Sequence, residues 1–172
     1  MPNTYTLIAS NTVSTAVASI TFSSIPATYT DLLLKWSAST SNTSRDQEYI
    51  TFNGTSTNYS GRVLRGFDNT NVGSTTSATT SFDMDRIGGG TNYTNVFTNS
   101  ELYVPNYASS NNKSVSLDTV LESSATSGTS QFISLEAGLW SNSAAITSIT
   151  FAPAASNYVQ YSTFYLYGIK NS

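Results

Sequence analysis

The sequence predicts an all-β protein: a single, jelly-roll-like β-sandwich over residues 1–172, with long loops rich in Ser, Thr and Asn. Three observations predict this class. Short runs of alternating apolar and polar residues recur, and clusters of Ser, Asn, Gly and Pro separate them. No run has a convincing helical periodicity. Charged residues make up only 10% of the chain, while 11 Tyr, 8 Phe and 2 Trp supply core material, the reverse of a disordered composition.

The alternating runs give the expected strands in order: Thr4–Ala9, Ala18–Ser23, Asp31–Ala38, Glu48–Asn53, Arg62–Phe67, Ser81–Arg86, Thr98–Val104, Ser114–Leu121, Gln131–Trp140, Ala145–Phe151 and Ser162–Ile169. The segment "TDLLLKWSAS" is typical of a central strand, with Leu32, Leu34 and Trp36 on its inward face. The polar stretches between the runs are expected to be loops, where such scaffolds carry recognition.

Two strands carry large side chains on both faces. In "QFISLEAGLW" one face holds Ile133, Leu135, Ala137 and Leu139, and the other holds Phe132, Glu136 and Trp140. The last strand, "YSTFYLYGI", places its Phe and Leu on one face and its three tyrosines on the other. We expect the Phe and Leu to point inward. Either a neighbouring subunit or a second sheet of the same domain then covers the tyrosines.

Composition excludes several function classes. The chain has no Cys and no His, which removes disulfides, Cys/His zinc sites and Ser-His-Asp catalysis. Its 7 Lys and Arg are scattered along the sequence and the net charge is −3, which argues against nucleic acid as a partner. The start "MPNTYTLIAS" lacks the features of a signal peptide, and no run has the apolar length of a membrane span. We expect no metal ion and no cofactor.

Acidic pairs are the remaining chemical candidates. Asp83 and Asp85 share one face of a strand in "FDMDR", a spacing that could hold Ca²⁺ or act in glycoside hydrolysis. A solvated strand edge is the simpler interpretation. Asp46 and Glu48 form a similar pair beside Arg45, where a surface ion pair is expected.

Several tyrosines and one tryptophan are hard to place inside so polar a domain. Tyr and Trp suit sites where one end is buried and the other meets a polar partner. The candidate interface or ligand residues are therefore Tyr161, Tyr165, Tyr167, Trp140, Tyr103 and Tyr107. The alternative is that these rings line the rim of the sandwich.

Several phrases of the sequence resemble a family of small structural proteins of tailed bacteriophages, common in aquatic phages. They include "TYTLIASNTV" and "ITFSSIPATYTDLLLKWSAS", and most specifically "YVPNYA", "GLWSNSAAITSI" and "YSTFYLYGI". The likeness covers nearly the whole chain. It implies a β-sandwich carried on the virion and assembled in the host cytoplasm, and it implies no catalytic residue.

Three functions follow as hypotheses. The first is a capsid decoration protein that binds the major capsid protein or other virion proteins, stabilises capsomer contacts, and forms a homo-oligomer, with a trimer favoured. The second is a tail-fibre or head-fibre module that binds host surface glycans through exposed Tyr and Trp. The third, a carboxylate-based glycosidase built on Asp83 and Asp85, is the weakest, and we expect no enzymatic activity.

Overall fold

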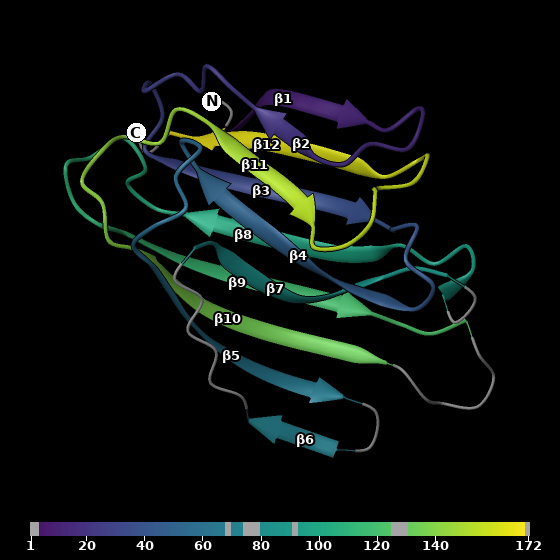
Figure 1. The fold of residues 1–172 in the computed structure, drawn as a ribbon. Helices are drawn as coiled ribbons and strands as arrows, with labels where there is room; N and C mark the ends of the chain where they lie inside the picture. The colour runs from purple at the N-terminus through teal and green to yellow at the C-terminus, as the bar shows by residue number, and fades with distance from the viewer. Residues whose placement is uncertain (1–3, 68–69, 74–79, 91–92, 125–130, 171–172) are drawn as a thin grey trace.

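Two antiparallel β-sheets packed face to face form the computed structural model, which describes residues 4–67, 70–73, 80–90, 93–124 and 131–170 (Figure 1). The eight-stranded sheet has the order β1 (Tyr5–Thr12), β12 (Thr163–Ile169), β3 (Asp31–Ala38), β8 (Thr98–Val104), β9 (Lys113–Leu121), β10 (Phe132–Trp140), β5 (Tyr59–Phe67) and β6 (Thr70–Gly73). The four-stranded sheet has the order β2 (Ile20–Phe22), β11 (Ile149–Pro153), β4 (Arg45–Phe52) and β7 (Phe82–Gly88). The prediction of an all-β sandwich is confirmed.

The chain repeatedly crosses from one sheet to the other. Strands β2, β4, β7 and β11 lie in the smaller sheet, and β3, β5, β8 and β12 lie in the larger one. This alternation resembles the winding of a jelly roll, to which the β9–β10 hairpin adds two strands in the middle of the larger sheet. Neighbouring strands of each sheet are therefore mostly distant in sequence.

Each predicted strand overlaps an observed one, and the ranges Asp31–Ala38 and Thr98–Val104 agree at both ends. Strand β6 was not predicted, because Thr70–Gly73 lies in a polar stretch expected to be a loop. This short edge strand has no apolar alternation of its own, and its antiparallel pairing with β5 places it in the sheet.

Aromatic side chains fill the space between the sheets in two groups. In one group, the rings of Trp36 and Phe164 pack on Phe151 with centroids 5.0 and 5.5 Å away. In the other, Phe52 lies 5.3 Å from Phe82 and 5.6 Å from Trp140 in edge-to-face arrangements. Such pairs add about 0.5–1.5 kcal/mol each beyond the area that they bury.

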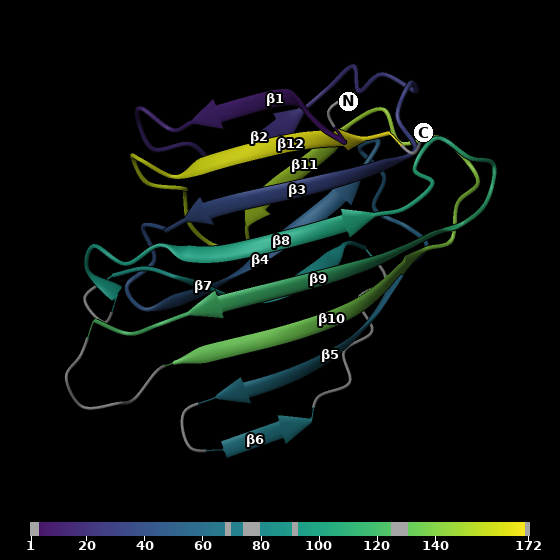
Figure 2. The same ribbon diagram turned by 180° about the vertical axis from the view of Figure 1, so that it is seen from behind.

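The two sheets differ in width, so that β5 and β6 of the larger sheet extend beyond β7, as both ribbon views show (Figures 1 and 2). The smaller sheet covers one face of the larger sheet. No strand of the described ranges covers the opposite face. In the same part of the chain, no helix has the length and apolarity needed to cross a membrane.

Candidate interaction surface

The uncovered face of the eight-stranded sheet, called here the outer face, is turned towards the reader in Figure 2. Most large hydrophobic side chains that the described residues expose lie on it: Tyr5, Leu7, Leu64, Val120, Ile133, Leu135 and Leu139. The one remaining exposed side chain of this kind, Tyr161, lies in the loop before β12. Soluble monomers rarely gather exposed apolar groups in this way, and such patches mark interaction sites.

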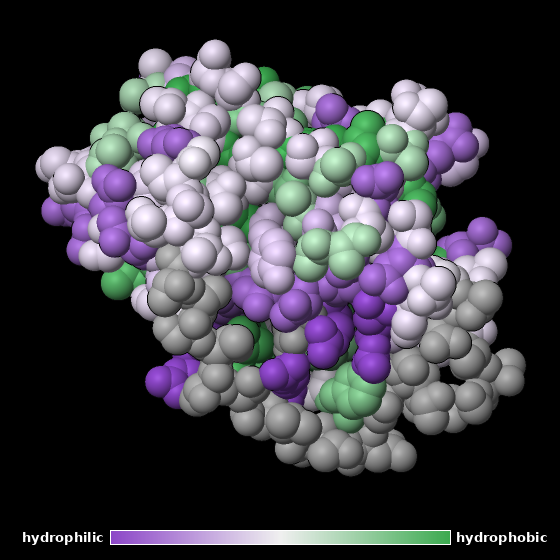
Figure 3. Space-filling view, in the orientation of Figure 1, coloured by the Kyte–Doolittle hydropathy of each residue, from purple (hydrophilic) through white to green (hydrophobic). Residues whose placement is uncertain are grey.

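The opposite surface of the sandwich is polar. The four-stranded sheet turns Gln47, Tyr49, Thr51 and Thr150 outward. The space-filling view of this side is mainly pale and purple, with scattered green (Figure 3). The apolar surface of the molecule is therefore concentrated on one sheet.

Strands β9, β10 and β5 form an aliphatic half of the outer face. Strand pairing aligns Val120 with Ile133, and Leu135 with Leu64. Leu64 and Ile133 are 63% and 60% exposed, values normal for a charged side chain and unusual for two adjacent aliphatic ones. Paired residues lie side by side on the same face of a sheet, so these side chains form one continuous exposed apolar surface.

Strands β1, β12 and β8 form a tyrosine half. The rings of Tyr165 and Tyr167 are stacked, with centroids 6.4 Å apart and planes 26° apart. The hydroxyl of Tyr103 donates a 2.8 Å hydrogen bond to the Asp31 carboxylate. That hydrogen bond is the main cause that raises the pKa of Tyr103, and burial adds to it. Tyr5, at the edge strand, is 56% exposed.

A charged row of Lys35, Glu101 and Asp118 crosses the middle of the outer face from β3 to β9. Lys35 Nζ lies 2.7 Å from Glu101 Oε2 across β3 and β8, and Glu101 is aligned with Asp118 of β9. Burial and then the charge of Glu101 raise the pKa of Asp118. The row therefore holds one cation and two carboxylates, and Asp118 is the carboxylate without an ion pair of its own on this row.

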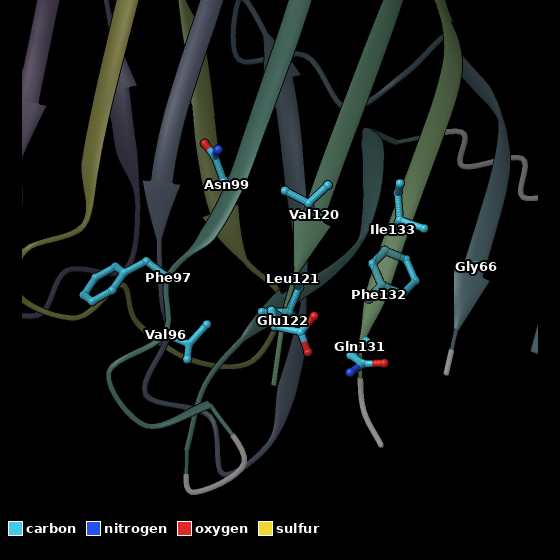
Figure 4. Close-up of a pocket in the computed structure, with 10 residues that line it drawn as sticks. All are labelled: Gly66, Val96, Phe97, Asn99, Val120, Leu121, Glu122, Gln131, Phe132 and Ile133. Carbon is cyan, nitrogen blue, oxygen red and sulfur yellow. The ribbon is translucent and has the colours of Figure 1, made fainter. Parts of the chain in front are cut away.

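A hollow of about 510 Å³ lies at one end of the aliphatic half (Figure 4). Val120 and Ile133 come from neighbouring strands, and Glu122 and Gln131 follow and precede the same strands in sequence. Gly66 of β5 is paired with Ile133 of β10. A methyl group at Gly66 would have Ile133 as its only close neighbour, at 3.1 Å. The missing side chain leaves open space beside Ile133, where the apolar surface is hollowed.

The structure separates the candidate residues that the sequence predicts. Tyr165, Tyr167 and Tyr103 lie on the outer face, half-buried, and Tyr161 is 69% exposed. Phe164 and Leu166 point inward as expected, and both are fully buried.

Trp140 and Tyr107 are both fully buried, and this corrects the interpretation of them as surface residues. Trp140 packs between Phe52 and Tyr59 because β10 turns Phe132, Glu136 and Trp140 towards the core. The Tyr107 hydroxyl donates a hydrogen bond to the carbonyl of Pro26. Neither ring can stack on a ligand in this structure.

Sequence reasoning missed the aliphatic half altogether. It grouped Ile133, Leu135, Ala137 and Leu139 on one face of a strand, and this grouping is confirmed. The group faces solvent, whereas the face with Glu136 is buried. The only signal in the sequence was that the opposite face of the same strand carries both Phe132 and Trp140.

The acidic residues Asp46, Glu48 and Asp83 all accept hydrogen bonds from other residues of the fold. The Asp46 carboxylate accepts hydrogen bonds from the backbone of Gln47 and Ala155 and from the Ser156 hydroxyl, and Glu48 is fully buried. The expected surface ion pair with Arg45 is therefore wrong. Asp83 Oδ2 accepts a 3.1 Å hydrogen bond from Gln47.

The side chain of Asp85 lies outside the described residues, so the pairing of Asp83 with Asp85 is not described. Among the residues that are described, no cluster of three or more acidic side chains could hold a metal ion.

The basic residues are less scattered in space than in sequence. Arg45, Arg65 and Arg86 line one hollow of about 170 Å³ together with Phe67 and Phe132. The Arg45 guanidinium carbon lies 4.2 Å from the centroid of the Phe67 ring, a cation–π contact. These side chains come from both sheets: Arg45 and Arg86 from the smaller one, and Arg65, Phe67 and Phe132 from the larger one.

Comparisons of the chain with protein-family models and with curated proteins find no match. The likeness to phage virion proteins stays a prediction from the sequence. The function proposed for this chain therefore rests on the outer face.

Proposed function

We propose that this chain is a structural protein of a bacteriophage particle, a capsid decoration protein that binds at the head surface and stabilises capsomer contacts. The observation that carries the proposal is the apolar outer face. A sandwich that works alone in solution gains nothing from exposing Leu64, Ile133 and Leu135, whereas a subunit that is always bound buries them. The sequence resemblance supports the same function.

The mechanism proposed is mechanical. Each copy buries a modest area against its neighbours, and many copies act together, so that the assembly holds more tightly than any single contact. Because the large side chains that the face exposes are mainly apolar, and the charged ones are few (Lys35, Glu101, Asp118 and Arg62), attachment should depend weakly on salt. No bond-making or bond-breaking step is assigned to any residue.

The test is the copy number per particle, measured by quantitative mass spectrometry against the major capsid protein. A copy number comparable to that of the capsid protein is expected, and washing with strong salt should leave it unchanged. A Leu135→Asp variant should be lost from particles, and Thr51→Asp, on the polar face of the other sheet, is the matched control. Absence of the protein from particles would refute the proposal.

A second candidate function rests on the tyrosine half. Tyr5, Tyr165, Tyr167 and Tyr103 lie near one another on β1, β12 and β8, and aromatic rings on a sheet face can stack on sugars. A fibre module that binds host glycans would use this half. Glycan-array binding that Tyr165→Ala abolishes, and that Tyr49→Ala on the opposite sheet leaves intact, would favour this function, together with a low copy number typical of tails.

A further inference from the structure

The outer face has two unlike halves of equal width. In the strand order β1-β12-β3-β8-β9-β10-β5-β6, three strands lie on one side of β8 and three lie between β8 and the edge strand β6. The first three carry Tyr5, Tyr165 and Tyr167 of the tyrosine half together with Lys35, and the second three carry the aliphatic half. Tyr103 lies on β8 itself. Strand β8 is thus the centre line of the apolar surface.

We propose that two copies of this chain pack their outer faces together around a two-fold axis that runs along β8. This rotation lays β1, β12 and β3 of one copy over β5, β10 and β9 of the other. The tyrosine half of each copy then covers the aliphatic half of the other. Such an isologous contact is the commonest arrangement in homo-oligomers. It goes beyond the proposed function because it concerns the free protein, and attachment to a particle would replace the second copy at the same face.

The charged row supports this axis. Rotation about an axis parallel to the strands preserves height along them, so residues of one lateral row meet residues of the same row. The row reads Tyr165, Lys35, Glu101, Asp118 and Leu135 from β12 to β10. Around β8, Lys35 meets Asp118 of the second copy, and Tyr165 meets Leu135 of the second copy.

Other axes along the strands cover less of the face or set like charges together. An axis between β3 and β8 would pair Lys35 with Glu101 of the second copy, but it would leave β5, and with it Leu64, outside the contact. An axis along β3 would place the two Lys35 side chains against each other. An axis between β8 and β9 would place Glu101 against Asp118 of the second copy. Around β8 the two Glu101 side chains meet at the axis, each held in its ion pair with Lys35 of the same chain, and each Lys35 has a further donor for Asp118 of the other copy.

The area agrees with what a specific dimer needs. Seven strands spaced by about 4.8 Å and about seven residues long cover roughly 800 Å². A standard interface buries about 800 Å² on each partner. Aligned sheets pack about 10 Å apart through their side chains, with strand directions within about 30°, which this row pairing tolerates.

The test is sedimentation equilibrium of the purified full chain, with circular dichroism to check that each variant folds. A dimer is expected. Leu135→Ser, at a position 56% exposed, should raise the dissociation constant at least tenfold. A monomer up to about 100 µM, well above the dissociation constants of specific interfaces of this size, would overturn the proposal. So would a trimer, which the sequence analysis favours, or a dimer that Leu135→Ser leaves unchanged.

Charge reversal tests the axis itself. Lys35→Glu and Asp118→Lys should each weaken self-association, because each places like charges at both symmetric contacts. An equimolar mixture of the two variants should dimerise again, because both contacts in the mixed dimer then join opposite charges. Lys170→Glu, at an exposed position outside the charged row and after the end of β12, is the matched control. Failure of the mixture to recover would overturn the axis along β8, whatever the particle copy number shows.

Discussion

The indole N–H of Trp36 donates a 2.9 Å hydrogen bond to the carboxylate of Glu48 inside the core, joining β3 of the larger sheet to β4 of the smaller one. The Tyr158 hydroxyl donates a second hydrogen bond to the same carboxylate. Burial raises the pKa of Glu48 to about 7, although both hydrogen bonds oppose that rise. The contact between the sheets therefore contains a carboxyl group that is half protonated near neutral pH.

The first prediction concerns the pH dependence of stability. Glu48 binds its proton more tightly in the folded protein than in the unfolded chain, so the free energy of unfolding falls as pH rises through the interval from 4.5 to about 7. The loss that this group contributes is about 3 kcal/mol, at 1.36 kcal/mol for each pH unit. Urea denaturation at a series of pH values from 4.5 to 9 measures it.

Glu48→Gln should remove this slope, because glutamine has the shape of the protonated acid and never ionises. The variant should match the parent protein near pH 4.5 and exceed its stability above pH 8. Glu122→Gln, at an exposed position, is the control and should leave the slope intact. A parent protein whose stability rises between pH 5 and 8 would contradict the assignment to Glu48.

Trp140 provides the second prediction. Its ring is fully buried and packs 5.6 Å from Phe52 and 6.2 Å from Tyr59. Trp140→Ala should therefore lower the free energy of unfolding by about 3–5 kcal/mol, as measured by denaturant titration. Tyr161→Ala, at a ring 69% exposed, should change it by less than about 0.5 kcal/mol. Equal effects of the two variants would contradict the burial described.

The same tryptophan shows what the sequence could and could not predict. Alternation assigns residues to the two faces of a strand, and it did so correctly for β10. It cannot tell which face is inward when both carry large side chains. That choice depends on the neighbours β9 and β5, and the pairing with β5 joins segments far apart in the sequence. The strands were therefore predictable, and the exposed aliphatic half of the outer face was not.

Gly138 provides the third prediction. A Cβ atom at this buried position of β10 would lie 2.6 Å from the Phe82 ring and 2.8 Å from Val115. Gly138→Ala should lower the free energy of unfolding by about 1–3 kcal/mol, because the close-packed core must shift to admit a methyl group. Gly66→Ala is the control, since its one close neighbour, Ile133, is exposed and can move. Thermal melts of the two variants compare them directly, and a larger loss for Gly66→Ala would refute the packing argument.

The fourth prediction concerns Asn53, which follows β4 and holds the segment before β11 in place. Its side-chain oxygen accepts hydrogen bonds from the backbone N–H groups of Thr147 and Ser148, at 2.8 and 3.1 Å, and its amide donates to the carbonyl of Ala145 at 2.8 Å. The backbone at Asn53 has φ of 52°, a conformation that Asn tolerates better than most residues. Asn53 therefore forms the turn after β4 and also holds residues 145–148 in place through three hydrogen bonds.

These two contributions can be separated by comparing two substitutions. Asn53→Gly loses the hydrogen bonds and keeps a residue that adopts positive φ freely, so it should lower the free energy of unfolding by about 1–3 kcal/mol. Asn53→Ala loses both and should be less stable than the glycine variant by about 1 kcal/mol. Denaturant titrations of the two variants measure the difference. An alanine variant at least as stable as the glycine variant would show that the left-handed backbone at this position carries no cost, and that the hydrogen bonds to Ala145, Thr147 and Ser148 account for the whole effect.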